Sequence, residues 1–236
     1  MYLASRKSVG VTELAGELDI HKSTAFRILD TFLEAGIVEK NRETLKYKLG
    51  PAILRLSERY YKNFNIIIAA KPIMEQLAAD IHESVHLCVY SNNSAVVIEQ
   101  ILSNSRLVVN AKIGNREPLH CSSVGKCLLA FVPEEDRGEM ISNITFEIFT
   151  EKTIRDEQSL LEEIERVKAQ GYAIDDGELN ADIKCVAVPV SDNRGMYTYS
   201  LGTSGAISRM TEEKVNRIIP LMLKAAKDIS AGHNYY

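Results

Sequence analysis

The stretch His21-Lys22-Ser23-Thr24, followed one helical turn later by Arg27, gathers hydrogen-bond donors at the start of a predicted helix. Arginine and lysine side chains can pair with guanine, and serine and threonine hydroxyls can contact a phosphate or a base. In a helix-turn-helix the second helix lies in the major groove, and its N-terminal residues meet the base edges. These five residues are therefore candidates for reading duplex DNA, although an ordinary helical hairpin with solvated polar ends has the same pattern.

Two short helices must position these donors. Residues 11–18 carry apolar side chains at helical spacing, and Thr12 is predicted to cap the N-terminus of this helix. After a polar break, residues 23–36 form a second amphipathic helix, with Ser23 predicted as its cap and Gly36 as its C-terminal stop.

Two short strands, 37–40 and 45–49, follow around the polar turn 41–44 and predict a β-hairpin. The order helix, turn, helix, hairpin is typical of a winged helix-turn-helix. The hairpin carries basic residues around an aromatic one, which are predicted to hold phosphates or to probe the minor groove. These residues are Lys40, Arg42, Lys46, Tyr47 and Lys48.

Charge is distributed unevenly along the 236 residues, whose net charge is −4. Residues 1–62 carry 11 lysines and arginines against 8 acidic residues, a net charge of +3, and the remainder carries −7. This division fits a modestly basic nucleic-acid-binding module attached to an acidic body, and it also fits chance variation.

The four cysteines form no C-x-x-C pair, which favours a reducing compartment. Apolar runs stay well short of the roughly 20 residues that span a bilayer, and Arg6 and Lys7 interrupt any signal-peptide pattern. We therefore expect a soluble protein of the cytoplasm that makes no membrane contact.

Beyond the hairpin the pattern predicts two helices, 51–62 and about 66–81, the second with a possible kink at Pro72. From Ser84 onward strands and helices mix, so the fold class is α+β with a largely antiparallel sheet. The predicted strands are 85–90, 95–101, 107–110, 172–174, 183–190 and 197–203, and the predicted helices are 123–132, 156–169 and about 211–229.

The neighbours His120 and Cys121 raise the question of a nucleophile or a metal site. Their side chains point in different directions on an extended chain, so catalysis would need them to converge with other groups through space. A zinc site with Asp175 and Cys185 is conceivable, but the spacing of these residues is not diagnostic of one. We therefore predict no metal, no cofactor and no catalytic residue.

The chain resembles the IclR family of bacterial transcriptional regulators over nearly its whole length. VTELAGELDIHKSTAFRILDTFLEAGIVEK (residues 11–40), followed by YKLGPAILRL (47–56), is similar to that family's winged helix-turn-helix and its exit into a linker helix. The second half carries three more matching stretches in the family's order and spacing. They are PLHCSSVGKCLLA (118–130), GYAIDDGE (171–178), and KCVAVPV (184–190) running on to SGAISR (204–209).

The resemblance implies a GAF-like domain that binds a small organic or aromatic acid, and assembly as a homodimer or homotetramer. By residue-for-residue matching it places these positions at the wall of the effector pocket: Ser122, Ser123, Asp175, Cys185, Gly202, Thr203 and Ser204. Backbone amides at the helix start after Ser122 would favour an anion, Gly125 would permit close approach of the ligand, and Asp175 would accept from a ligand hydroxyl. As alternatives, Ser122 could merely cap the helix, and Cys185 could be an inert core thiol.

The family pattern also has a longer helix ahead of the first one predicted here, of which residues 1–7 match only the tail. A glycine stands at Gly202 where acid-binding relatives can carry a hydroxyl. The predicted domains are a winged helix-turn-helix at 1–50, a linker helix at 51–65 and a GAF-like effector-binding domain at 66–236.

The predicted function is DNA-binding transcriptional regulation without catalysis, with affinity for an operator controlled by a small metabolite. Two alternatives remain open at this point: a thiol- or serine-dependent enzyme with an accessory module, and a sensor that acts only through protein contacts. The lack of a G-x-S-x-G motif and the basic residues at 21–48 favour the regulator. The pattern gives neither the effector, the operator, nor the direction of regulation.

Overall fold

The computed structural model describes residues 2–63, 65–105, 108–192 and 194–232. The chain divides into two compact units, Met1–Phe64 and Asn65–Tyr236, which are described one at a time.

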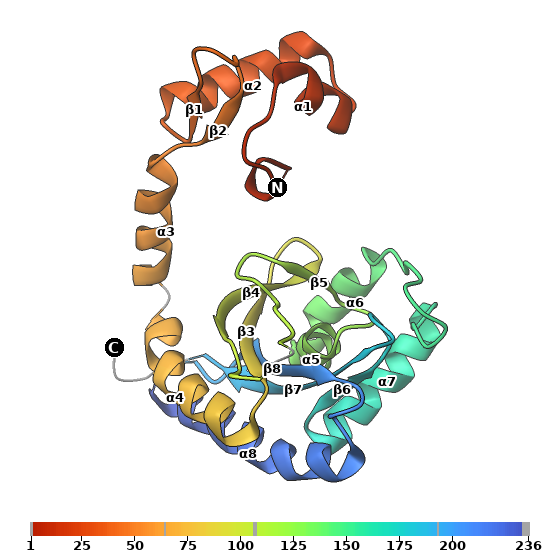
Figure 1. Cartoon of the computed structure of the whole chain (residues 1–236). Helices are drawn as coiled ribbons and strands as arrows, with labels where there is room; N and C mark the ends of the chain where they lie inside the picture. The colour runs from red at the N-terminus through yellow and green to blue at the C-terminus, as the bar shows by residue number, and fades with distance from the viewer. Residues whose placement is uncertain (1, 64, 106–107, 193, 233–236) are drawn as a thin grey trace. The chain divides into compact units, whose positions relative to one another are not determined.

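The first unit is built from short helices and one hairpin (Figure 1). Its elements are the 3₁₀ helix η1 (Tyr2–Ser5), α1 (Val11–Glu17), α2 (Lys22–Glu34), β1 (Val38–Lys40), β2 (Tyr47–Leu49) and α3 (Ala52–Asn63). Its core forms where the apolar faces of the helices and the hairpin meet, and includes Leu14, Ala25, Leu29, Val38 and Tyr47. This arrangement confirms the predicted winged helix-turn-helix order.

The two predicted helix caps of this unit are each wrong by two residues. The N-cap of α1 is Gly10, whose N–H donates to Glu13 Oε2 at 3.0 Å, rather than Thr12. The N-cap of α2 is His21, so Ser23 lies inside the first turn. At the other end of α2 the prediction is confirmed, because Gly36 follows the helix with a φ of +69°, a conformation that glycine adopts without strain.

The second unit is a six-stranded antiparallel sheet with the strand order β5-β4-β3-β8-β7-β6, which confirms the α+β class. Its strands are β3 (Ser84–Tyr90), β4 (Ser94–Ile101), β5 (Arg116–Pro118), β6 (Ala173–Asp176), β7 (Ile183–Ser191) and β8 (Tyr197–Ala206). Its helices are α4 (Asn65–Ile81), α5 (Ser123–Phe131), α6 (Glu134–Ser142), α7 (Glu157–Gln170) and α8 (Glu212–Gly232).

Helices cover both faces of this sheet (Figure 1). The helices α4 and α8 lie side by side on one face, and α5 packs on the other face with α7 beside it. Every residue of α5 from Ser123 to Ala130 is buried, which is expected of a helix enclosed on all sides. The start of α5 thus lies over the middle of the sheet. The stretches that carry the family resemblance, 118–130, 171–178 and 184–190, come together there.

Two glycines allow this close packing. A Cβ at Gly125 would lie 2.5 Å from Leu119 Cα, and a Cβ at Gly202 would lie 2.7 Å from Val124 Cγ1 and closer still to the ring of His86. Neither position has room for a side chain, so glycine sets the spacing between α5, the preceding loop and β8.

The predicted element boundaries differ from the structure in a few places. Of the predicted strand 107–110, residues 108–110 are not a strand, and Leu107 lies outside the described residues. The short strand β5 and the helix α6 were missed. Pro72 lies within α4, and Pro220 lies within α8. In the described part of the chain, no helix is both long and apolar enough to cross a membrane.

Candidate DNA-reading helix and ligand cavity

The N-terminal end of α2 presents its predicted donors to solvent. His21, Lys22, Ser23, Thr24 and Arg27 are all exposed. Their neighbours Ala25 and Leu29 are buried, because one face of the helix packs on the core. The structure gives Lys22 and Arg27 no ion-pair partner among the described residues, so their charges are available to an external ligand.

The wing between β1 and β2 presents its basic residues less uniformly. Arg42 is exposed in the turn, where Asn41 Oδ1 accepts hydrogen bonds from the N–H groups of Glu43 (2.9 Å) and Thr44 (2.8 Å). Two of the lysines are paired with carboxylates: Lys46 Nζ lies 2.8 Å from Glu13 Oε1, and Lys48 Nζ lies 3.1 Å from Glu39 Oε2. Both pairs are partly exposed to solvent, which weakens them.

Tyr47 is corrected from a DNA contact to a core residue. Only 1% of its surface is exposed, and its backbone pairs with Val9. The Nζ of Lys40 lies 5.3 Å from the centroid of the ring. The alternation of β2 turns Tyr47 inward and Lys48 outward, so the aromatic ring anchors the wing and the lysines face solvent.

A cavity of about 250 Å³ lies between the start of α5 and the sheet. Strands β3, β5, β6, β7 and β8 contribute to it, together with the loops at 109–111 and 179–180. The lining residues are His86, Val109, Asn110, Ala111, Glu117, Ser122, Ser123, Val124, Asp175, Leu179, Asn180, Ile183, Cys185 and Ser204.

Five of the residues predicted for the pocket meet at this cavity. Asp175, Cys185 and Ser204 lie opposite one another on β6, β7 and β8, so their side chains share one face of the sheet. Ser122 and Ser123 face them from the start of α5. The helix and the strands thus bring together residues that are distant in sequence, from Ser122 to Ser204.

The two serines of α5 differ in what they can offer a ligand. The Ser122 hydroxyl donates to Pro118 O at 2.6 Å and accepts from Gly125 N at 3.0 Å, so it acts as the helix cap. Ser123 forms no side-chain hydrogen bond within the described residues, although it is buried. Its hydroxyl is the one free to bind a ligand.

Three predicted pocket residues do not line the cavity. The space beside Gly125 is filled by the Pro118–Leu119 backbone, so this glycine serves the protein's own packing. Gly202 lies beneath the His86 ring and Val124, which separate it from the cavity. Thr203 points to the opposite face of β8 from Ser204, and its hydroxyl donates to Ser84 O at 2.9 Å.

The cavity wall is acidic, a property that the residue pattern did not predict. Glu117 and Asp175 line it, and no lysine or arginine does so in the described part of the chain. Burial raises the pKa of Asp175 to about 6, although the N–H of Glu178 donates to Asp175 Oδ1 at 2.6 Å. Burial, with the nearby charge of Asp175, also raises the pKa of Glu117. Glu117 directly precedes the stretch 118–130 that resembles the family, and that position was the only signal in the sequence that could have suggested it as a pocket residue.

His86 also lines the cavity and was missed, although the alternation of β3 places it on the inner face. Burial lowers its pKa to about 4, so the imidazole is neutral near pH 7. Its Nδ1 atom is buried and has no hydrogen-bond partner among the described residues. The ring therefore adds a neutral polar group to the wall.

The thiols are poorly suited to catalysis. Burial and nearby carboxylates raise the pKa of Cys185 and of Cys121, so both remain protonated near neutral pH. Ser204 Oγ donates to Cys185 Sγ at 3.1 Å. His120 Nε2 donates to Glu147 O at 2.9 Å, and the ring packs against Phe146 and forms no hydrogen bond to a thiol among the described residues. Within the described residues, no group of three or more potential metal ligands comes together.

Comparison with known proteins agrees with this geometry along the whole chain. The family model described as "IclR helix-turn-helix domain" matches residues 2–42, and "Bacterial transcriptional regulator IclR C-terminal" matches residues 58–231. The HTH-type transcriptional regulator KdgR of Escherichia coli (strain K12) is 31% identical over 234 residues, which cover 99% of this chain and 89% of that protein.

Solved structures share the fold as well. The IclR protein of Thermotoga maritima is similar with a TM-score of 0.76 at 26% identity, covering 99% of this chain and 94% of that one. An IclR homologue from Microbacterium hydrocarbonoxydans, crystallised with 4-hydroxybenzoate, has the same fold, with a TM-score of 0.81 at 24% identity over 98% of this chain and 93% of that one. The chain belongs to the IclR family and is a transcriptional regulator with a helix-turn-helix DNA-binding domain.

Proposed function

We propose that this regulator binds an operator through α2 and the wing, and that a small organic or aromatic acid in the α5 cavity changes its affinity for that operator. The observation that carries the DNA part is the exposed tip of α2, where Lys22 and Arg27 have no ion-pair partner among the described residues. Lys22, Ser23 and Arg27 contact bases, and the wing lysines contact phosphates. Residues 1–50 are then the DNA-binding domain, 51–65 the linker and 66–236 the effector-binding domain.

The ligand that fits the cavity best is an acid that also carries hydroxyl groups. Its carboxylate lies at the start of α5, where the Ser123 hydroxyl and backbone N–H groups favour an anion. Its hydroxyls donate to Asp175 and Glu117, which accept hydrogen bonds when ionised. A bare carboxylate is repelled by those two groups unless they take up protons. Their raised pKa values lower the cost of such proton uptake.

Regulation follows if the acid binds one arrangement of the regulator better than another, because the difference in affinity then shifts the population that binds DNA. A single helix-turn-helix covers only one half-site, so we propose that the chain acts as a homodimer or homotetramer. We further propose that it works in the cytoplasm and catalyses no reaction. The raised pKa values of the buried thiols support the last point.

The DNA part is tested by fluorescence anisotropy on DNA from upstream of the protein's own gene, compared with scrambled DNA across a salt series. Arg27→Ala is expected to weaken specific binding by about 5- to 150-fold, the range for one base contact. Lys227→Ala, at an exposed position on α8, is the matched control and should change nothing. Equal binding of Arg27→Ala and the unaltered chain would refute the assignment of α2.

The ligand part is tested by thermal shift with benzoate, 4-hydroxybenzoate, pyruvate and lactate. Ser123→Ala, Asp175→Ala and Cys185→Ala are expected to reduce the stabilisation given by a compound that binds. Thr203→Ser serves as the control, because its hydroxyl bonds to Ser84 O away from the cavity. A stabilising compound that is insensitive to all three cavity variants binds elsewhere, and the assignment of the cavity would then be wrong.

A further inference from the structure

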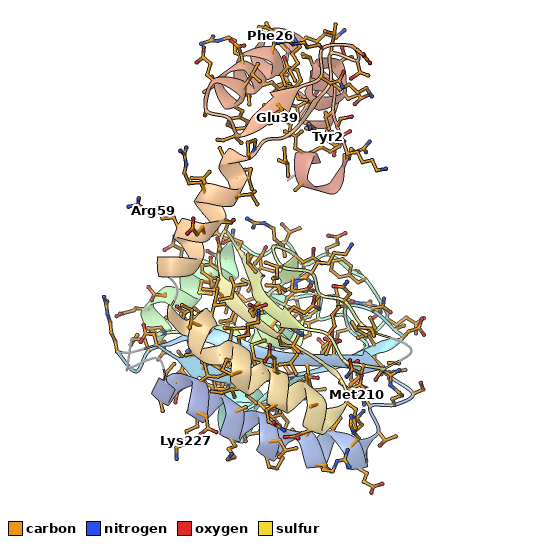
Figure 2. All side chains as sticks on the ribbon, turned by 60° about the vertical axis from the view of Figure 1, so that its left-hand side comes forward. Tyr2, Phe26, Glu39, Arg59, Met210 and Lys227 are labelled. Atoms are coloured by element: carbon orange, nitrogen blue, oxygen red, sulfur yellow. The ribbon has the colours of Figure 1, made fainter. Side chains whose placement is uncertain are left out.

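Phe26 is an apolar side chain on the surface of α2, the helix proposed to bind DNA. It is 45% exposed, and it lies four residues after Lys22 and directly before Arg27. Figure 2 shows it at the edge of the first unit away from Tyr2. Nothing in the hydrogen-bonding scheme of the DNA-reading helix accounts for a phenyl ring at this place.

The ring shares its face of the helix with the predicted donors. Residues four apart lie one above the other on a helix, so Lys22, Phe26 and Asp30 form one exposed row, with Ser23 and Arg27 alongside it. Ala25 and Leu29 turn to the core. Among the described residues the structure gives Phe26 no ring contact and no cation partner.

The chemistry of the major groove narrows what such a ring can contact. A phenyl group neither donates nor accepts a hydrogen bond, and of the base-edge groups in that groove only the C5-methyl of thymine is apolar. The charges of Lys22 and Arg27 attract this face of α2 to phosphates and guanines. Binding through these residues places the Phe26 ring at the base edges as well. The phenyl ring is exposed to water in the free protein, and contact with that methyl group would remove apolar surface of both groups from water.

We propose that Phe26 is a specificity-determining residue that selects thymine, through its C5-methyl group, at one position of each operator half-site. This inference rests on the proposed function, since it requires α2 to enter the major groove.

The test begins with the full-length chain selecting sites from a random duplex pool, in parallel with Phe26→Ala and Phe32→Ala. Phe32 is on the same helix and 37% exposed, and it serves as the matched control. The unaltered chain and Phe32→Ala are expected to select a thymine that Phe26→Ala no longer selects. Replacing that thymine by uracil, which lacks only the methyl group, should weaken binding of the unaltered chain about fourfold. The same replacement should leave the affinity of Phe26→Ala unchanged.

The possible results separate the two proposals. If the unaltered chain selects no sequence at all, the proposed function fails and this inference fails with it. If it selects a site, but Phe26→Ala selects the same site and uracil costs nothing, only the role of Phe26 is overturned. A Phe26→Ala variant that keeps its base preference but changes mass in sedimentation would place the ring in a subunit contact, which also overturns the inference.

Discussion

Lys126 Nζ, in the buried part of helix α5, lies 3.1 Å from Glu163 Oε1 on α7 and also contacts Glu178 beyond the end of β6. Lys126 is 1% exposed, and the two glutamates are 14% and 12% exposed. The lysine therefore ties α7 and the loop after β6 to the helix that begins at the cavity. Leu179 and Asn180, at the cavity wall, directly follow Glu178.

Removing this cation should destabilise the protein. Lys126→Met leaves the largely buried carboxyl group of Glu178 without its cation and leaves Glu163 with the exposed Arg166 as its partner, and we expect the free energy of unfolding to fall by about 3–5 kcal/mol. Urea denaturation followed by circular dichroism measures it. The triple variant with Glu163→Gln and Glu178→Gln removes the two negative charges that faced the lysine and should recover most of the loss. A single variant that loses less than about 1 kcal/mol would show that the network contributes little.

The stability of the protein should depend on pH through two buried carboxyl groups. Burial raises the pKa of Glu178 to about 7 and that of Asp175 to about 6, so both bind a proton more tightly in the folded state. Their contribution is therefore largest at low pH and is lost as the pH rises from about 4 to about 7. Unfolding measured in urea at several pH values should show this slope. Glu178→Gln and Asp175→Asn should each flatten it, and an unchanged slope in both variants would contradict the pKa shifts.

Glu117 should control how well the cavity accepts a carboxylate. Replacing it by glutamine removes one negative charge from the wall without changing its shape much. At pH 8 we expect Glu117→Gln to bind benzoate, an acid without hydroxyl groups, roughly fivefold more tightly, as the loss of about 1 kcal/mol of repulsion would give. The unaltered chain should bind the same acid more tightly as the pH falls below the raised pKa values. Isothermal titration calorimetry measures both affinities, and weaker binding of benzoate by the variant would contradict the repulsion assigned to Glu117.

Gly202 should tolerate no side chain. A methyl group there would meet Val124 Cγ1 at 2.7 Å and the His86 ring at a still shorter distance, so α5 or the ring must move. We expect Gly202→Ala to lower the free energy of unfolding by about 1–3 kcal/mol and to weaken ligand binding. Gly138→Ala is the control, because a Cβ at Gly138 meets no atom within 4 Å and the residue lies inside α6. That change should stabilise the protein by about 0.4–1 kcal/mol. Equal melting temperatures for the two variants would refute the packing argument.

The local pattern of the chain was sufficient for much of the fold. Apolar spacing gave both helices of the helix-turn-helix and most strands of the sheet, and Gly36 marked the end of α2 correctly. These features depend on neighbours within one or two turns, which the sequence displays directly. The pattern located these helix caps incorrectly. Thr12 and Ser23 have side chains typical of an N-cap, but the N-cap positions are held by Gly10 and His21.

Residue type and order alone determined the modestly basic first part, the donor-rich start of α2 and the family. The tertiary structure decided which side chains face which way. The inward face of β2 buries Tyr47, the pleat of β8 separates Thr203 from Ser204, and the approach of α5 to the sheet leaves Gly125 and Gly202 outside the cavity. It also brought Glu117 and His86 to the wall. The physical reason is that a cavity is formed by residues from distant strands, and their relative placement is fixed by sheet register and helix packing rather than by local sequence.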